Sequence, residues 1–486
     1  MRKIVVGLAF LCLWSSSHCQ TFSDFLARIH ATPENERTAL VDSFMNAVPA
    51  FPFVEQDTLA HFIYRGNATS VTVPGDANGW NTVLSPMTKI SGTNFWYRTD
   101  VFENDARLDY KFFVNGNWIL DPRNPNTCAG GYGANSELRM PGYQMPPEIA
   151  YYPGIAHGTL KDTTFFSVNL GNSRTIRIYL PPGYDGSMDR YPMMLFHDGL
   201  EYISLAQANH VLDYMIHEQR IEPTIGVFIP PVNRSSEYAG NLQDKFTKFI
   251  IEEVIPWVDA RFRTIPSPEK RAVLGASYGG NISLWLGMNH PEIFGHVAAQ
   301  SSYIASSISD RFRTGPTLDL KLHLILGTYD IPVLIPMVRN FILILDAKGY
   351  TYHYHEYHEG HSWGFWRAHI DDALEMFFPY QATAIEPGHD GMPEKFQLLQ
   401  NYPNPFNSKT TIRFLVEQEA FIAIKILNVT GQSVRTLLSQ REPAGEYSLI
   451  WDGTNASGVP QGSGIYFYQL VANGVLADVR RMVLLR

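Results

Sequence analysis

A serine flanked by glycines, set between a strand pattern and a helix pattern, constrains this chain more than any other feature. Residues 275–279 read Gly-Ala-Ser-Tyr-Gly, directly after an apolar strand-like run at 272–274 and directly before an apolar helical run. Glycine on both sides permits a strand-to-helix turn so tight that Cβ atoms would collide, and such a turn would lift the Ser277 hydroxyl above the edge of a sheet. A helix N-terminus also offers free N–H groups to an oxyanion. The motif therefore predicts that Ser277 is a nucleophile.

Strand and helix patterns alternate on both sides of this motif. Near-continuous apolar runs are followed by amphipathic runs of helical spacing, as at 191–196, 204–219, 224–229, 241–262, 297–300, 322–326, 350–356 and 366–377. Buried strands separated by amphipathic helices are typical of a parallel sheet covered on both faces. We therefore predict a doubly wound α/β domain over residues 150–380.

A nucleophilic serine needs an imidazole to take its proton and a carboxylate to orient that imidazole. Asp330 comes just past a strand-like run and is the predicted acid, with Glu359 and Asp310 as rivals. Glu359 is too close in sequence to His361 to reach it easily, and Asp310 has no strand before it. His361 lies beyond the last strand in the loop Glu-Gly-His-Ser-Trp and is the predicted base. The predicted catalytic set is therefore Ser277, Asp330 and His361.

Three further histidines precede His361. His353 and His355 alternate along a strand-like run, and with His358 they leave a zinc site open as an alternative. We expect packed or solvated histidines on an edge strand instead. No metal and no other cofactor is expected.

The region from 150 to 380 resembles the esterase D or putative-esterase family, which includes enterobactin esterases, feruloyl esterases and acyltransferases of similar fold. The matching stretches, besides the serine motif, are Asn-Arg-Ser-Ser-Glu-Tyr at 233–238, Glu-Glu-Val-Ile-Pro-Trp-Val-Asp at 252–259 and His-Pro-Glu-Ile-Phe-Gly at 290–295. The resemblance implies an α/β-hydrolase fold and metal-free hydrolysis of carboxylic esters through an acyl-enzyme on Ser277.

In such a fold, backbone N–H groups form the oxyanion hole. Tyr278, directly after the serine, is one predicted donor, and Gly199 or Leu200, in the turn after the strand at 191–196, is the other. An ordinary polar turn is the alternative for the latter pair. The predicted substrate-binding side chains are Asp198, Arg234, Glu237 and Trp363. For Arg234 and Glu237, an ion pair that holds the loop is the alternative.

The first nineteen residues are predicted to be a secretory signal peptide. Arg2 and Lys3 precede an apolar run at 4–14, and the small Ser17 and Cys19 fit a cleavage site after residue 19. A lipoprotein signal acylated at Cys19 is the rival. Cleavage would leave Cys128 as the sole cysteine, so no intrachain disulfide is expected. No other run is long and apolar enough to cross a membrane.

Residues 20–145 are predicted to form a helical lead-in and a small β-sandwich. Apolar positions recur at helical spacing between 21 and 48, and short runs of period two follow between 59 and 120. The glycine- and proline-rich stretch at 128–147 is predicted to be a linker.

Two stretches of this region resemble glycogen-binding-like sandwich modules of the immunoglobulin-like E-set type, similar to carbohydrate-binding module family 48. They are Val-Pro-Gly-Asp-Ala-Asn-Gly-Trp at 73–80 and the run from Tyr110 to Asp121-Pro122. The resemblance implies the fold more firmly than sugar binding. Trp80 and Trp118 would stack on a sugar, or else take a core or turn role.

The C-terminal part reads as a linker at 381–395 and a second β-sandwich at 396–486. Its Asn-Tyr-Pro-Asn-Pro-Phe-Asn at 401–407, Trp-Asp-Gly at 451–453 and closing basic run resemble the sorting domain of the type IX secretion pathway. The resemblance implies an export address read by that secretion machinery. The protein would then be secreted or held at the cell surface after passage through the periplasm.

A formal net charge of −9 gives no reason to expect a nucleic-acid partner. We expect a secreted serine esterase that acts on feruloyl or acetyl esters of plant polysaccharides, with side activity on aromatic polyesters. A siderophore trilactone esterase and a non-catalytic glycan-binding surface protein are the alternatives. Whether water or another acceptor takes the acyl group stays open.

Overall fold

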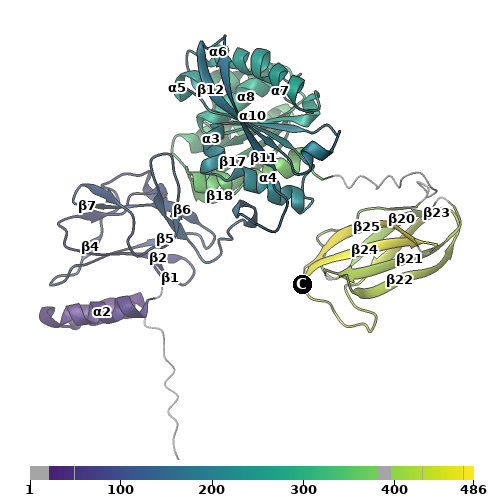
Figure 1. Ribbon diagram of the computed structural model, residues 1–486. Coiled ribbons are helices and arrows are strands. Elements are labelled where there is room, and N and C mark those ends of the chain that lie inside the picture. The colour runs from purple at the N-terminus through teal and green to yellow at the C-terminus, as the bar shows by residue number, and fades with distance from the viewer. Residues whose placement is uncertain are drawn as a thin grey trace, which may run out of the picture. The chain divides into compact units, whose positions relative to one another are not determined.

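The computed structural model describes residues 21–48, 50–380, 396–416, 418–429, 431–473 and 475–485. It divides into two compact units, Met1–Gln381 and Ala382–Arg486 (Figure 1). The predicted signal peptide at 1–19 and the predicted linker at 381–395 lie outside the described residues. Among the residues that are described, no helix is long and apolar enough to cross a membrane.

The first unit is built on a central sheet that has six parallel strands and two antiparallel strands at one edge. The order of these eight is β11 (Thr159–Ser167), β12 (Asn172–Leu180), β14 (Ile225–Ile229), β13 (Met193–His197), β15 (Arg271–Ala276), β16 (His296–Gln300), β17 (Lys321–Tyr329) and β18 (Thr351–Gly360). The strands from β14 to β18 pair in parallel, and β12 pairs antiparallel with β14. The predicted doubly wound α/β fold is confirmed.

Two apolar cores cover the two faces of this sheet. Met193 and Leu195 of β13 lie in one core and Met194 and Phe196 in the other, because alternate residues of a strand point to opposite faces. The helices of the second core are α3 (Gly199–Ser204), α4 (Ala208–His217) and α12 (Ile370–Phe377). Those of the first are α6 (Gln243–Lys248), α7 (Ile255–Arg261), α8 (Tyr278–Asn289), α9 (Ser306–Thr314) and α10 (Leu334–Lys348).

Helix boundaries differ from the predicted ones in three places. The helix expected at 241–262 is one helical run, α6 to α7, with a π-helical turn at Phe249–Val254. The helix expected at 366–377 is split into α11 (Trp363–Arg367) and α12, and the one expected at 204–219 is the shorter α4, which α3 precedes.

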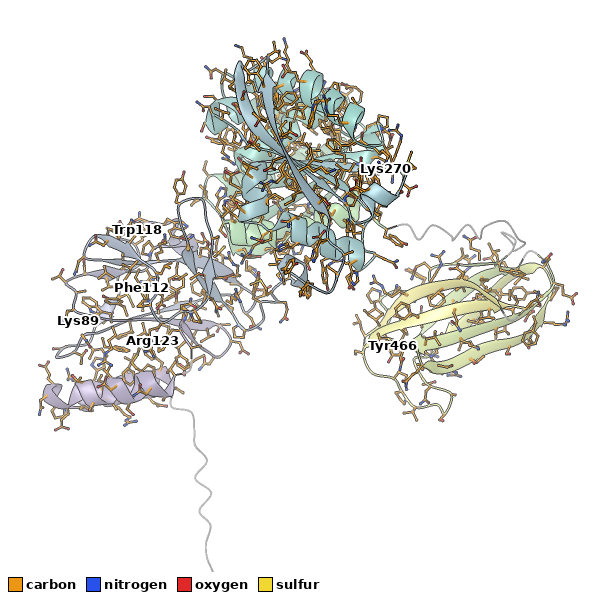
Figure 2. All side chains as sticks on the ribbon, viewed as in Figure 1. Lys89, Phe112, Trp118, Arg123, Lys270 and Tyr466 are labelled. Atoms are coloured by element: carbon orange, nitrogen blue, oxygen red, sulfur yellow. The ribbon has the colours of Figure 1, made fainter. Side chains whose placement is uncertain are left out.

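The N-terminal part of this unit begins with α1 (Phe22–Ala31) and α2 (Arg37–Ala47) and continues as small sheets. One sheet contains β1 (Phe53–Glu55), β2 (Leu59–Arg65), β5 (Phe95–Val101) and β4 (Thr88–Lys89), and another contains β3 (Val71–Thr72), β7 (Phe112–Val114) and β8 (Asn117–Ile119). Phe112 is fully buried among these strands, whereas the Trp118 side chain is 46% exposed (Figure 2). We call this part, residues 21–145, the N-terminal sandwich.

The N-terminal sandwich shares its remaining strands with the central sheet. β6 (Arg107–Tyr110) pairs in parallel with β18 through Arg107 and Glu359, and β10 (Asn135–Arg139) and β9 (Thr127–Cys128) continue beyond it. The prediction of a linker at 128–147 is therefore wrong for 135–139, which is a paired strand. The glycine content suggested a linker over the whole stretch, but the glycines at 130, 131 and 133 form only the loop between β9 and β10. We call the contacts of β18 and the residues after it with β6 and β10 the seam.

The second unit is a β-sandwich with its own apolar core. One sheet contains β19 (Phe396–Leu398), β20 (Thr410–Val416) and β23 (Gly445–Trp451), and the other contains β22 (Ser433–Glu442), β21 (Ala420–Asn428), β24 (Gly464–Ala472) and β25 (Val475–Leu484). The core includes Trp451, Tyr468 and Phe406, all at most 2% exposed. The predicted sandwich-like fold of the tail is confirmed.

Candidate active site

Ser277 occupies the turn between β15 and α8. Its backbone has φ 57° and ψ −119°, a strained conformation for a residue with a Cβ. A Cβ on Gly275 would lie 2.4 Å from the backbone of Gly279, so the turn cannot close with a larger residue at 275. The Ser277 N–H donates to Gln300 O at 2.8 Å, which ties the turn to the next strand. The sequence motif is thus folded as predicted.

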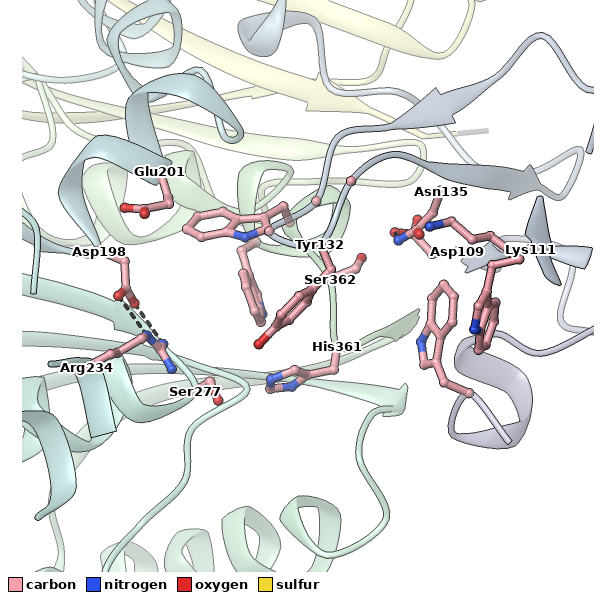
Figure 3. Close-up of a pocket in the computed structure, with 17 residues that line it drawn as sticks. Asp109, Lys111, Tyr132, Asn135, Asp198, Glu201, Arg234, Ser277, His361 and Ser362 are labelled. Carbon is pink, nitrogen blue, oxygen red and sulfur yellow. Dashed lines mark hydrogen bonds and ion pairs between the residues drawn. The ribbon is translucent and has the colours of Figure 1, made fainter. Parts of the chain in front are cut away.

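His361 and Asp330 meet at the ends of the two neighbouring strands. Asp330 follows β17, His361 follows β18, and His361 Nδ1 lies 2.7 Å from Asp330 Oδ1. The Asp330 carboxylate is buried and also accepts the N–H of Ile331 at 2.6 Å. His361 and Ser277 line the same cleft and lie side by side in Figure 3. The structure therefore brings together the three residues that were predicted as a set.

The two rival acids have other partners. Glu359 Oε1 lies 3.0 Å from His369 Nε2, while Asp310 pairs at the surface with Arg313. Burial alone would lower the pKa of His369, but its hydrogen bonds to Asp372 and Glu359 and their charges raise that pKa to about 9. In the described part of the chain, neither rival forms a hydrogen bond or ion pair with His361.

The three other histidines do not gather into a ligand set. His353 stacks on His323 of the neighbouring strand, with ring centroids 5.1 Å apart, and His358 Nδ1 lies 2.6 Å from Asp105 Oδ1. In the described residues, no group of three or more His, Cys, Asp and Glu side chains is arranged to hold a metal ion. Cys128 is buried and free.

The turn after β13 forms a second wall beside Ser277. Asp198 has φ 52° and accepts two hydrogen bonds from Arg234, at 2.7 and 2.8 Å. Arg234 Nη2 also donates to Ala276 O at 3.0 Å, so this pair connects the turn to the residue before Ser277. A Cβ on Gly199 would lie 2.2 Å from Ile229 N, which explains the glycine. Tyr278 begins α8 and Gly199 begins α3, and helix-initial N–H groups lack helical partners.

Three of the four predicted substrate-binding side chains line the cleft, namely Asp198, Arg234 and Trp363. Glu237 does not: it is fully buried and accepts from Arg174 at 2.9 and 3.1 Å. The expectation for Glu237 as a binding residue does not fit this position. Arg234 and Glu237 both form ion pairs, but with different partners.

The N-terminal sandwich supplies the other wall of the cleft. The cleft has a volume of about 880 Å³, and its lining includes Trp80, Lys111, Trp118, Tyr132 and Asn135 from residues 21–145. Figure 3 shows Lys111 and Asn135, two labelled members of this group, on the side of His361 away from Ser277. Sequence reasoning missed Lys111, Tyr132 and Asn135. The one signal was a tyrosine among three glycines, a composition typical of binding loops as well as of linkers.

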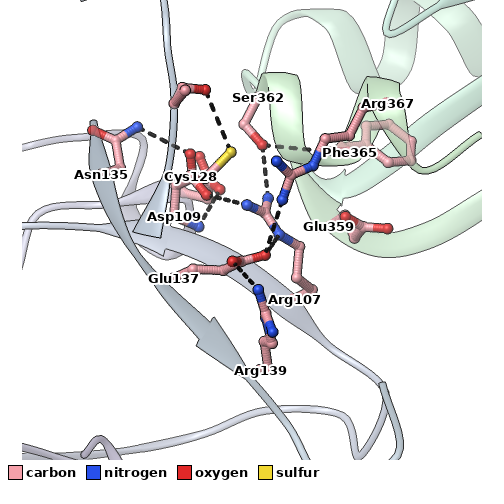
Figure 4. A network of polar contacts seen from close by, with 12 residues as sticks. Arg107, Asp109, Cys128, Asn135, Glu137, Arg139, Glu359, Ser362, Phe365 and Arg367 are labelled. Atoms are coloured by element: carbon pink, nitrogen blue, oxygen red, sulfur yellow. Dashed lines mark hydrogen bonds and ion pairs between the residues drawn. The ribbon is translucent and has the colours of Figure 1, made fainter. Parts of the chain in front are cut away.

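A buried arginine connects this wall to the loop that carries His361. The Arg107 side chain is 0% exposed and donates to Glu137 at 2.6 Å, to Asp109 at 2.6 Å and to Ser362 Oγ at 2.9 Å (Figure 4). Ser362 directly follows His361 and caps α11. The neighbouring glycines leave no free space: a Cβ on residue 360 would lie 2.1 Å from Asp76, and one on residue 364 would lie 2.0 Å from Arg107. The seam thus fixes the position of His361.

Comparison with known proteins agrees with this fold. Residues 167–377 match the family described as "Putative esterase", and residues 407–474 match the "FlgD Ig-like domain". The ferric enterobactin esterase structure from Salmonella typhimurium aligns with a TM-score of 0.58 at 21% identity, over 66% of this chain and 94% of that one. At such identity the likeness concerns the fold.

Curated relatives are distant in sequence. The chain is 28% identical over 277 residues to the endo-1,4-beta-xylanase/feruloyl esterase of Xylanibacter ruminicola, covering 54% of this chain and 37% of that protein. It is 26% identical over 251 residues to the iron(III) enterobactin esterase of Escherichia coli K12, covering 46% and 61%. An uncharacterized protein of Bacillus subtilis, YjcH, is 23% identical over 97% of its length. Residues 167–377 are therefore similar to esterases and have an α/β-hydrolase-like fold, and these likenesses support a carboxylic ester hydrolase.

Proposed function

We propose that this protein is a serine esterase in which Ser277 is the nucleophile, His361 the general base and Asp330 the acid that orients the base. The observation that carries this assignment is the 2.7 Å contact of His361 Nδ1 with Asp330 in the cleft where Ser277 is held at positive φ. With Nδ1–H bound to the carboxylate, the Nε2 lone pair is left free to accept a proton.

The reaction proceeds through an acyl-enzyme. His361 Nε2 takes the proton of Ser277 Oγ as that oxygen attacks the ester carbonyl, and the N–H groups of Tyr278 and of Gly199 or Leu200 stabilise the oxyanion. The imidazolium then gives its proton to the departing alcohol. Water, activated by the same imidazole, releases the acid and restores Ser277. An acyl acceptor other than water would use the same intermediate.

The substrates that fit best are feruloyl or acetyl esters of plant polysaccharides. A cleft of about 880 Å³ lined by Trp363, Trp366 and Tyr132 is wide enough for an aryl acyl group, and aromatic polyesters suit the same surface as a side activity. The xylanase/feruloyl esterase relative supports the feruloyl class. A siderophore trilactone is the second candidate, because the enterobactin esterase structure aligns over 66% of this chain.

Export completes the proposal. The sequence before residue 20 has the composition of a signal peptide, and the second unit would act as an address for the type IX secretion machinery. A secreted or surface-held enzyme meets polymeric esters, whereas siderophore release takes place inside cells. Export therefore favours the polysaccharide substrate.

The test is hydrolysis of methyl ferulate, 4-nitrophenyl acetate and enterobactin by the mature protein and by Ser277→Ala. We expect the wild type to cleave a ferulate or acetate ester and Ser277→Ala to lose at least about 10³-fold in kcat. Ser307→Ala, an exposed serine outside the cleft, is the matched control. Equal rates for wild type and Ser277→Ala would refute the assignment, and a marked preference for enterobactin would favour the second candidate.

A further inference from the structure

One end of the cleft carries the positive charge of Lys111. Lys111 lines the cleft and is half-buried, and no carboxylate within the described residues pairs with its ammonium group. The nearest acid in sequence, Asp109, is already satisfied, since its two oxygens accept from Arg107 at 2.6 Å and from Asn135 at 2.9 Å. A lysine that is half removed from water without a partner favours an anionic ligand.

An aromatic pair lies in the same wall. The rings of Trp80 and Trp118 are 6.2 Å apart at 42°, and the ring of Trp118 lies 5.2 Å from that of Phe113 at 59°, while 46% of Trp118 stays exposed. A core role for Trp118 is excluded by this exposure. Both tryptophans line the cleft, so a ring that enters it meets an aromatic surface next to the Lys111 side chain.

Trp80 is held there at a cost in backbone energy. Its φ is +62°, a region that bulky residues rarely adopt. Hydrogen bonds from its N–H to Gly75 O at 2.8 Å and from its indole to Asp76 Oδ1 at 3.0 Å hold it in place. Strained residues fixed in this way concentrate at binding sites.

The opposite end of the cleft has the reverse character. Figure 3 shows Glu201, Asp198 and Arg234 at that end and Lys111, Asp109 and Asn135 at the other, with Ser277 and His361 between them. Asp198 and Arg234 neutralise one another, whereas Glu201 Oε2 is buried with no hydrogen-bond partner in the described residues. An anionic group would be repelled near Glu201 and attracted near Lys111. The cleft can therefore orient a substrate that has a charge at one end only.

We propose that the end of the cleft formed by the N-terminal sandwich is a subsite for a ring bearing a carboxylate, with the ring on the Trp80–Trp118 pair and the carboxylate at Lys111. The subsite rests on the proposed function, because it selects among esters that reach Ser277. Two sources supply this chemistry: a uronic acid residue of the polysaccharide, or an aromatic acid such as a terephthalate monoester released from a polyester.

Paired substrates that differ only in charge test the subsite. Monomethyl terephthalate and its uncharged isostere methyl 4-carbamoylbenzoate are compared by the ratio of their kcat/KM values. A charged hydrogen bond in a half-buried site predicts that wild type favours the acid by about tenfold or more, that Lys111→Met loses this preference and that Lys111→Arg keeps it. Lys161→Met, an exposed lysine outside the cleft, is the matched control. Equal ratios for wild type and Lys111→Met would overturn the subsite.

Equilibrium binding separates this result from the catalytic assignment and distinguishes the two sources. Titration calorimetry on Ser277→Ala with terephthalate, with a glucuronic-acid-substituted xylo-oligosaccharide and with the unsubstituted oligosaccharide requires no turnover. If either acid binds more strongly than the neutral probe, and if adding Lys111→Met weakens that binding about tenfold, the subsite is supported. The acid that binds then shows which of the two sources supplies the ligand. No difference between acid and neutral probes refutes the subsite even where nitrophenyl acetate is hydrolysed. If the wild type hydrolyses none of the esters but still binds the acid, the proposed function is refuted and the subsite is not.

Discussion

The protein has two β-sandwiches, and they are built into the molecule in opposite ways. The N-terminal sandwich shares a sheet with the hydrolase fold through β6 and supplies one wall of the cleft. The C-terminal sandwich forms a compact unit of its own, with a closed apolar core around Trp451. The same general fold thus lines the candidate active site in one case and forms a compact unit of its own in the other.

The two sandwiches also differ in how deeply their arginine ion pairs are buried. Arg107 in the N-terminal sandwich is fully buried between Asp109, Glu137 and the loop that carries His361. In the C-terminal sandwich, the Arg413–Glu446 pair is about half exposed. A buried arginine that loses its partners is costly, whereas a surface pair contributes little. A shared edge strand and buried charges therefore join the N-terminal sandwich to the fold beside it.

Deleting each sandwich should produce the largest contrast. Removal of residues 20–145 leaves β18 as an exposed edge and Ser362 without Arg107. We therefore expect kcat on 4-nitrophenyl acetate to fall by at least about 100-fold, because small displacements of a catalytic group reduce the rate by that much. Removal of residues 382–486 should change kcat by less than about twofold, since the catalytic set lies in the other unit. A folded protein lacking 20–145 with full kcat would contradict the integration of the first sandwich.

Replacing one arginine in each sandwich compares how much a buried and an exposed ion pair contribute to stability. Arg107→Met leaves the buried Asp109 without its cation and leaves Glu137 paired with Arg139, so the free energy of unfolding should fall by about 3–5 kcal/mol, measured by urea titration. The matched change Arg413→Met should cost no more than about 1 kcal/mol.

Kinetics of Arg107→Lys separate positioning from stability. Lysine keeps the charge near Asp109 and Glu137 but cannot reach three acceptors with a planar fork. We therefore expect stability to be largely restored, while kcat stays reduced and the pH profile of kcat/KM shifts, because His361 is less firmly held against Asp330. Wild-type kcat and pH profile in Arg107→Lys would show that Arg107 supports only the fold.

The α/β fold and the approach of His361 to Asp330 were predictable because their signals are local. Gly275 and Gly279 flank Ser277 in sequence, and strand ends place Asp330 and His361 at one edge of a parallel sheet. The position of His361 just after β18 follows from the same rule.

The seam and the wall of the cleft that the N-terminal sandwich supplies could not be derived in this way. The pairing of Arg107 with Glu359 spans two parts of the chain that have separate patterns, and no local signal links them. A buried ion such as Arg107 looks like a surface residue in sequence, because burial depends on tertiary partners. Glu237 was misjudged for the same reason, since its partner Arg174 is distant in the chain.

The smallest expected effect is a difference in pH response between the two units. His369, near the seam, has a pKa raised to about 9 by its hydrogen bonds to Asp372 and Glu359 despite burial, and burial followed by the charge of Asp109 raises the pKa of Asp76 to about 8. A group whose folded pKa exceeds its unfolded value stabilises the fold below the unfolded pKa, and this contribution is lost as the pH rises through the folded pKa. For His369 the loss between about pH 7 and 9 amounts to at most about 3 kcal/mol. Calorimetry should therefore show that the melting temperature of the first unit falls as the pH rises through this window, and that it falls less in His369→Gln. The second unit, whose sequence at 396–486 contains no histidine, should keep a constant melting temperature. Parallel pH responses of the two units would show that these ionisable groups contribute no more to the first unit than the surface charges contribute to the second.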